Sequence, residues 1–230
     1  MSRDGGGLRV RVKTARKRTA QSTRWLERQL NDPYVKRAKA DGFRSRAAYK
    51  LSELDERFAF LKGKRRVVDL GIAPGGWSQV VRRLVPKAAI VGIDLLPVDP
   101  IEGVTIFQLD FMADVAPERL MAALDGAPDL VLSDMAANTV GHPQTDALRT
   151  MGLVEAALAF AIDVLEPGGA FVGKVFAGGA DTALVAEMKR NFASVKHAKP
   201  AASRKASSEW YVVAQGFKGR AKVAAEPGDA

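Results

Sequence analysis

The chain has 230 residues, a formal net charge of +9 and no cysteine, which fits one large domain and excludes disulfides, thiolate metal sites and a cysteine nucleophile. It has only two histidines and no apolar stretch of about 18 residues, so we expect neither a histidine-rich metal site nor a membrane span. The first residues lack the apolar core of a secretory signal, which predicts a cytoplasmic protein.

The positive charge is concentrated at the amino-terminal end. Residues 1–46 hold 14 Lys and Arg against four Asp and Glu, whereas the rest of the chain holds 21 against 22. Residues 1–21 also carry few large apolar groups, so we predict a disordered basic arm that contacts a phosphate backbone. The alternative is a solvated tail that only aids solubility.

Helical spacing of apolar residues comes first along the chain. One helix is expected to start near Ser22 or Thr23 and to end before Pro33, and a second to run over residues 45–58. Strands then alternate with helices. The expected strands are 66–70, 89–95, 104–110, 129–134, 170–176, 193–199 and 209–217, and the expected helices between them are 76–85, 117–126, 146–165 and 181–192.

This alternation predicts an α/β fold with a doubly wound, mostly parallel sheet of seven strands. The last two strands are joined by a Ser/Lys loop too short for a helix, so the last strand should be antiparallel. We expect a single domain over residues 22–220, with a helical segment (22–62), a Rossmann-like core (63–220) and a flexible tail at 221–230.

The segment VVDLGIAPGGWSQVV joins the first strand of this core to its helix through a glycine-rich turn. Gly71, Gly75 and Gly76 would let backbone approach a ligand where side chains would clash. The turn departs from the dinucleotide pattern G-x-G-x-x-G, which disfavours a pyrophosphate cradle. Asp94 and Asp110 end the next two strands, where they suit the ribose and the adenine amino group of an adenosine. The alternative is that they only cap strand ends.

From about Asp32 to Phe217 the chain resembles the FtsJ/RrmJ family of bacterial 23S rRNA uridine 2′-O-methyltransferases, and six segments carry the resemblance in order. They are DLGIAPGGWSQVV, GIDLLPVDPIEGV, LDF, SDMAAN, GKVF and SSEWYVV. Ile72 and Ala137 depart from the family's usual Ala and Pro. The resemblance implies a Rossmann-like S-adenosylmethionine-dependent methyltransferase that acts, as a monomer, on 23S rRNA in the large ribosomal subunit, with residues 22–62 facing the RNA.

The resemblance also implies two sets of site residues. Those expected to contact the cofactor are Gly75, Trp77, Asp94, Asp110 and Asp134. Those expected to form a catalytic tetrad are Lys50, Asp134, Lys174 and Glu209.

Lys174 is the most informative of the tetrad on physical grounds, because it lies inside the apolar strand AFVGKVF. Burial and a neighbouring Lys50 would favour the neutral amine that a general base requires. Asp134 and Glu209 would oppose this while orienting an ammonium, so a base and an orienting charge both remain open. Taken singly, Lys50 could be a solvated helix lysine and Glu209 could pair with Arg204 or Lys205.

A sugar hydroxyl is the expected methyl acceptor. Asp134 is not followed by the Pro-Pro-aromatic segment common in enzymes that methylate base nitrogens, and the cysteine common in pyrimidine carbon-5 methylation is absent. Phe43, Tyr49 and Trp210 offer stacking for RNA bases, but core packing is the favoured interpretation of each.

Three other functions remain open. A non-enzymatic RNA-binding ribosome assembly factor would have lost the tetrad or the glycine turn. A nicotinamide-dependent oxidoreductase would need G-x-G-x-x-G and gives no reason for the basic arm. A 2′-O-methyltransferase of tRNA, an mRNA cap or another RNA would keep the same chemistry.

Overall fold

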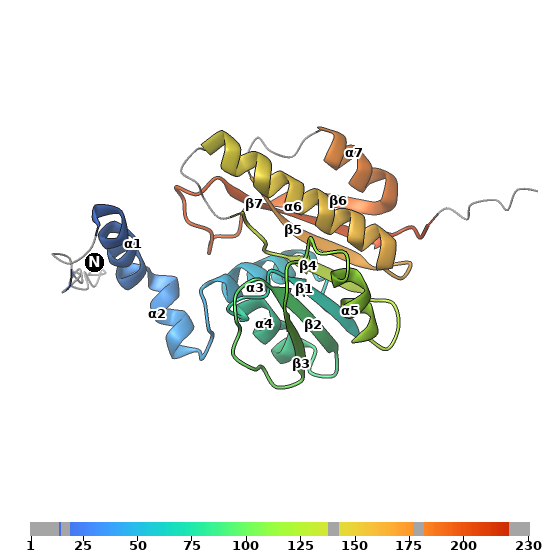
Figure 1. Ribbon diagram of the computed structural model, residues 1–230, viewed down its shortest axis with the longest axis horizontal. Helices are drawn as coiled ribbons and strands as arrows, with labels where there is room; N and C mark the ends of the chain where they lie inside the picture. Colours follow the sequence, from blue (N-terminus) through green and yellow to red (C-terminus); the bar gives the residue numbers. More distant parts are fainter. Residues whose placement is uncertain (1–13, 15–18, 138–142, 177–181, 221–230) are drawn as a thin grey trace, which may run out of the picture.

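The computed structural model describes residue 14 and residues 19–137, 143–176 and 182–220. One sheet of seven strands, in the order β3-β2-β1-β4-β5-β7-β6, forms the centre of the molecule (Figure 1). The strands are β1 Arg66–Leu70, β2 Ala89–Asp94, β3 Val104–Gln108, β4 Leu130–Ser133, β5 Ala170–Phe176, β6 Phe192–Ala198 and β7 Glu209–Phe217. Among the described strands, β7 pairs antiparallel with β5 on one side and with β6 on the other, and the remaining pairs are parallel. The predicted mostly parallel sheet with an antiparallel last strand is therefore confirmed.

Helices cover both faces of the sheet (Figure 1). Within the described residues they are α1 Ala20–Asn31, α2 Pro33–Ala40, α3 Ala47–Phe58, α4 Gly76–Leu84, α5 Ala116–Ala122, α6 Pro143–Val164 and α7 Thr182–Asn191. Apolar side chains of α5, α6 and α7 pack on one face, and those of α3 and α4 pack on the other. The helices α1 and α2 extend beyond the sheet, at the blue end of the ribbon. None of the described helices is long and apolar enough to cross a membrane.

Successive side chains of a strand point to opposite faces of the sheet and so pack into two separate cores. Val68 and Leu70 of β1 join the core under α5 and α6, whereas Val67 joins the core under α3 and α4. The central strands β1 and β4 are buried on both faces, as their continuous apolar sequences require. In β7, Tyr211 belongs to the α3 and α4 side, so polar groups at this strand's start face α3.

The structure adds a helix that the sequence analysis missed. Pro33 was expected to end one helix, and it does, but it also opens α2 as its first residue. Proline suits this position because it has no amide hydrogen to leave unbonded and its φ is already helical. The side chain of Asp32 caps α2 by accepting a hydrogen bond from the Tyr34 amide at 3.0 Å.

Several boundaries also differ from the expectation, by one to four residues. The first helix starts at Ala20, after the side chain of Thr19 accepts a hydrogen bond from the Ser22 amide, so residues 20 and 21 are helical rather than part of the arm. The strand β3 ends at Gln108, not at residue 110, because the chain turns away from the sheet there. Most of the predicted arm and all of the 221–230 tail lie outside the described residues.

Candidate active site

A cleft of about 520 Å³ opens at the carboxyl ends of β1, β2 and β4. This is the position where the strand order of an open α/β sheet reverses and where such sheets bind ligands. Three carboxylates, Asp94, Asp110 and Asp134, lie in its lining. The rest of the lining is mostly apolar and comprises Gly71, Ala73, Ile93, Leu95, Leu96, Leu109, Phe111, Met112, Met135, Ala136, Ala137, Arg149, Gly152 and Leu153.

Backbone amides hold two of these acids in place. The carboxylate of Asp94 accepts hydrogen bonds from the amides of Ala73 and Leu96, each at 2.9 Å. Asp110 lies two residues beyond β3, and its carboxylate accepts from the Met112 amide at 2.9 Å. Backbone hydrogen bonds thereby hold both carboxyl groups in place at the cleft, with their oxygens as acceptors.

At two of its three positions the glycine turn also lets segments of the protein itself approach closely. Gly71 lines the cleft, and a Cβ there would lie 2.8 Å from Cγ of Met135. Gly75 has φ of 107°, and a Cβ would lie 2.5 Å from Cδ1 of Ile101, so this glycine lets two loops of the protein meet. At Gly76 the Cβ would lie 2.5 Å from Oγ of Ser45, so the turn packs against the segment before α3.

Trp77 is buried beside the site rather than exposed in the cleft. Its ring nitrogen donates to the carbonyl of Ala47 at 2.9 Å, and its ring lies 5.7 Å from that of Tyr211. Neither Trp77 nor Gly75 is part of the cleft lining. Their contact with a cofactor therefore stays a prediction. Both residues lie close in the chain to Gly71 and Ala73, which do line the cleft.

The four residues predicted as a tetrad lie together, and Tyr211 completes a chain of contacts among them. Lys50 Nζ, from α3, is 2.7 Å from a carboxylate oxygen of Glu209 and donates to the Tyr211 hydroxyl at 3.0 Å. That hydroxyl donates to Oδ1 of Asp134 at 2.9 Å. Lys174 Nζ lies 3.1 Å from the same oxygen and also donates to the Asp134 carbonyl at 2.6 Å. We call this set of five the catalytic chain.

The charges in the catalytic chain support one another. Burial alone would raise the pKa of Asp134, but the charges of Lys174 and Lys50 and the Tyr211 hydrogen bond outweigh it, and the pKa is lowered. Burial, with the nearby charges of Asp134 and Glu209, raises the pKa of the Tyr211 hydroxyl well above its ordinary value. Asp134 is therefore an anion and Tyr211 a neutral hydroxyl at physiological pH.

Sequence reasoning missed Tyr211, although two patterns point to it. Alternate residues of a strand share a face, so Tyr211 lies on the same face as Glu209. It is also the register partner of Lys174 across the antiparallel pair of β5 and β7. Glu209 was open to pairing with Arg204 or Lys205, but its partner is Lys50, and it also accepts from the Ser203 hydroxyl at 3.0 Å.

The aromatic residues near this region divide into two groups. Tyr49 is buried, and its ring lies 5.6 Å from those of Phe43 and Tyr34, as core packing predicts. Trp210 is exposed, so the interpretation as a core residue was wrong for it. Trp210 follows Glu209 in β7, and the side chains of successive strand residues point to opposite faces of a sheet. The Trp210 side chain therefore points to the opposite face from that of Glu209.

Asp69 is a fully buried carboxyl group beneath the cleft. Its Oδ2 accepts from the Ser78 hydroxyl at 2.7 Å, and its Oδ1 has no partner within the described residues. Burial raises the pKa of Asp69 to about 7 against the hydrogen bond from Ser78, and the charges of Asp134 and Asp94 add to the rise. The folded protein therefore holds a proton here that the unfolded chain releases near pH 4.

This proton predicts a pH-dependent component of stability. Because the folded pKa is the higher one, the contribution is fully present below about pH 4 and is lost as the pH rises through about 7. Between pH 5 and pH 8, urea denaturation should show wild type losing about 2–3 kcal/mol more unfolding free energy than Asp69→Asn, which is neutral throughout. Equal losses in the two proteins would show that the Asp69 proton does not contribute.

A sheet with one antiparallel strand and an acidic cleft at the carboxyl ends of its central strands define the class of Rossmann-like methyltransferases. The family model of the FtsJ-like methyltransferases matches residues 43–217. The chain belongs to this family.

Three relatives illustrate the similarity. The chain is 74% identical over 220 residues to a protein of Novosphingobium aromaticivorans named ribosomal RNA large subunit methyltransferase E, with 96% of this chain and 99% of that one covered. A protein of the same name from Rhizorhabdus wittichii is 68% identical over 229 residues, with 100% of both chains covered. A crystal structure from Plasmodium falciparum described as a ribosomal RNA methyltransferase has a TM-score of 0.68 at 33% identity, covering 77% of this chain and 100% of that one.

Proposed function

We propose that this protein transfers a methyl group from S-adenosylmethionine to the ribose 2′-hydroxyl of a uridine in 23S rRNA, within the large ribosomal subunit. The observation that carries the proposal is the catalytic chain at the edge of the cleft, because Lys50, Asp134, Lys174 and Glu209 are brought together from four separate segments. The names of relatives at 74% and 68% identity support large-subunit rRNA as the substrate. The uridine and the 2′-hydroxyl rest on the family resemblance and on the lack of base-directed machinery.

The residues of the cleft fit S-adenosylmethionine better than a dinucleotide. Three carboxylates line a largely apolar space, which favours a cationic sulfonium and disfavours an anionic pyrophosphate. Asp94 would hold the ribose hydroxyls and Asp110 the adenine amino group, while Asp134, Gly75 and Trp77 complete the proposed set. When bound, S-adenosylmethionine supplies an electrophilic methyl group.

The side chains of the catalytic chain would position the acceptor and receive its proton. Lys174 is the proposed acceptor of the hydroxyl proton: its ammonium, which pairs with Asp134, would first release a proton to solvent, and the amine would then take the proton of the attacking hydroxyl. Its two contacts with Asp134 fix the position of its nitrogen. Lys50 and Glu209 would hold the ribose from the other end of the chain of contacts. The alternative role for Lys174 is a charged group that only orients the ribose.

We also propose an RNA contact for the basic arm, a cellular location and an oligomeric state. The basic arm would contact RNA phosphates without adding sequence specificity. A ribosomal substrate would place the enzyme in the cytoplasm, and we propose that it acts as a monomer. A non-enzymatic assembly factor is disfavoured because both the cleft and the catalytic chain are intact.

Label transfer tests this function directly. Large ribosomal subunits from cells that lack the gene are incubated with the protein and methyl-labelled S-adenosylmethionine, and the RNA is digested to nucleosides. The label is expected in 2′-O-methyluridine of 23S rRNA, with tRNA and mRNA as comparison substrates. Label on a base, or transfer to tRNA but not to the subunit, would contradict the proposal.

A further inference from the structure

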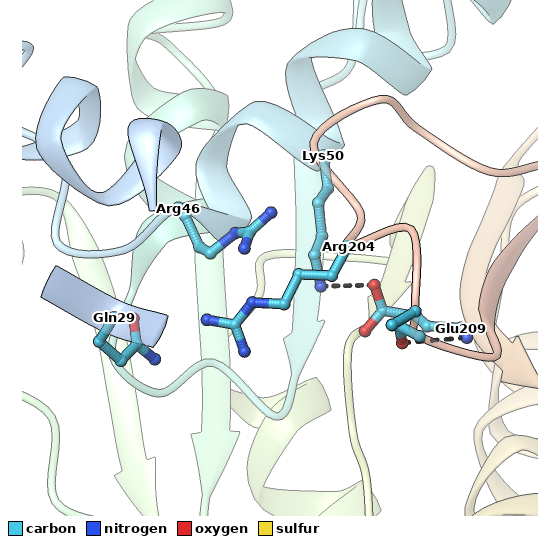
Figure 2. A pocket seen from close by; sticks show the side chains of 7 residues that line it. Gln29, Arg46, Lys50, Arg204 and Glu209 are labelled. Carbon is cyan, nitrogen blue, oxygen red and sulfur yellow. Dashed lines mark hydrogen bonds and ion pairs between the residues drawn. The ribbon is translucent and has the colours of Figure 1, made fainter. Parts of the chain in front are cut away.

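A second pocket, of about 360 Å³, is lined by Lys50 and Glu209 of the catalytic chain (Figure 2), and neither of these residues lines the cofactor cleft. It is formed by α1, α3 and the loop between β6 and β7, and we call it the arginine pocket. Its lining includes Gln29, Arg46, Lys50, Arg204, Ser207 and Glu209. Lys50 and Glu209 also belong to the catalytic chain, so the pocket adjoins the proposed site of methyl transfer.

The charges of the arginine pocket are not balanced by its own lining. Lys50 and Glu209 pair with each other at 2.7 Å, which leaves the guanidinium groups of Arg46 and Arg204. Both contact the same carboxylate oxygen of Asp32, which lies behind the pocket with a side chain only 8% exposed. Two cations therefore share one anion, and the pocket is electropositive.

Two guanidinium nitrogens of the arginine pocket donate no hydrogen bond within the described residues. Nε of Arg46 and Nη2 of Arg204 are buried and have no hydrogen-bond partner among the described residues. The other two nitrogens of Arg46 donate hydrogen bonds to the Asp32 carboxylate and to the carbonyl of Ala202, so the protein itself fixes the orientation of this guanidinium. Oriented guanidinium donors without acceptors match the several oxygens of a phosphate, because the planar guanidinium fork donates parallel hydrogen bonds to the oxygens of such an anion.

We propose that the arginine pocket binds a backbone phosphate of the substrate RNA, at or next to the nucleotide that is methylated. The identity of the RNA rests on the proposed function, but the phosphate chemistry rests on the pocket. The 2′-hydroxyl and the 3′-phosphate stand on neighbouring carbons of one ribose. A phosphate site that shares Lys50 with the catalytic chain therefore places a ribose hydroxyl beside that chain.

Arg204 is the residue to test, because its side chain is 35% exposed, whereas that of Arg46 is 14% exposed and bonded to two other groups. The matched control is Arg220, which also forms an ion pair, with Asp163, but lies beyond the opposite end of β7. Arg204→Gln and Arg220→Gln each remove one positive charge, so they change the net charge of the protein equally.

Binding to undermethylated large subunits is measured over a range of salt concentrations. Arg204→Gln is expected to weaken binding about tenfold and to reduce the slope of log K against log salt by about 0.7–0.9, the value for one phosphate contact. Arg220→Gln should leave both quantities at the wild-type value. Arg204→Lys should keep most of the slope, because the charge remains, while losing affinity with the planar fork.

The outcome separates this inference from the proposed function. Equal affinity and slope for Arg204→Gln and Arg220→Gln would overturn the phosphate site, even if wild type methylates the subunit. Failure of wild type to label the subunit would instead overturn the proposed function. Calorimetry with S-adenosylhomocysteine shows whether each variant is folded, since the cofactor cleft does not contain Arg204. If Arg204→Gln is unfolded, Arg204→Lys against Arg220→Lys decides the question through affinity alone.

Discussion

Replacing Lys174 by alanine is expected to slow methyl transfer by about 10²–10⁴-fold, the range typical for loss of a general base. The side chain is only 9% exposed and its Nζ lies 3.1 Å from Asp134, so alanine removes a proton acceptor that the protein holds in a fixed position. Binding of S-adenosylhomocysteine should change little, because Lys174 is not part of the cofactor cleft lining. Single-turnover rates on undermethylated large subunits measure the effect.

Lys174→Arg distinguishes the two proposed roles of this residue. Arginine keeps the positive charge but does not lose its proton usefully, and its planar group does not fit a site built for a compact ammonium. A general base predicts that Lys174→Arg is almost as slow as Lys174→Ala, whereas an orienting charge predicts substantial recovery. Lys196→Ala, on the exposed part of β6, is the control and should keep the wild-type rate.

Asp134→Asn is expected to lower the free energy of unfolding by about 3 kcal/mol. The carboxylate is the anion that contacts Lys174, and the charges of Lys174 and Lys50 lower its pKa. Asparagine keeps the shape but leaves the Lys174 ammonium, which is 9% exposed, without a counter-charge. Urea denaturation should show a lower midpoint with an unchanged slope. Methyl transfer should fall as well, because the oriented position of Lys174 depends on this contact.

Two further variants isolate the charge from the fold. Asp163→Asn removes one partner of an ion pair whose side chains are both more than 60% exposed, so it should cost far less stability than Asp134→Asn. Adding Lys174→Met to Asp134→Asn removes both charges and should recover part of the lost stability. A double variant less stable than either single variant would contradict the electrostatic explanation.

Local patterns in the sequence predicted most of the fold. Buried strands such as Arg66–Leu70 and Ala170–Phe176 are short apolar runs bounded by turn residues, so their positions could be read directly. Pro33 was predicted only to end a helix, but the same residue ends one helix and begins another. The start of α2 at Pro33 is supported by the side chain of Asp32, which caps the helix. In the sequence, a capping Asp is a weaker signal than a proline.

The candidate site was predictable residue by residue but not as an arrangement. Lys50, Asp134, Lys174 and Glu209 were named from motifs, and the structure brings them together, yet their roles stay predictions. The bridging hydroxyl of Tyr211 depends on the register of β5 against β7. The sharing of Asp32 by Arg46 and Arg204 joins residues 172 positions apart, and no local pattern reports such a contact.

The position of the antiparallel strand β7 along the chain has a consequence for synthesis. A nascent chain leaves the ribosome amino-terminal end first, so β7 is the last of the described strands to emerge. It carries both Glu209 and the bridging Tyr211, and it inserts between β5 and β6 rather than adding to an edge. In a nascent chain that ends after β6, Lys50 lacks both partners supplied by β7. If the proposed function holds, we expect products that terminate before β7 to transfer no methyl group, and activity to arise only when this strand enters the sheet.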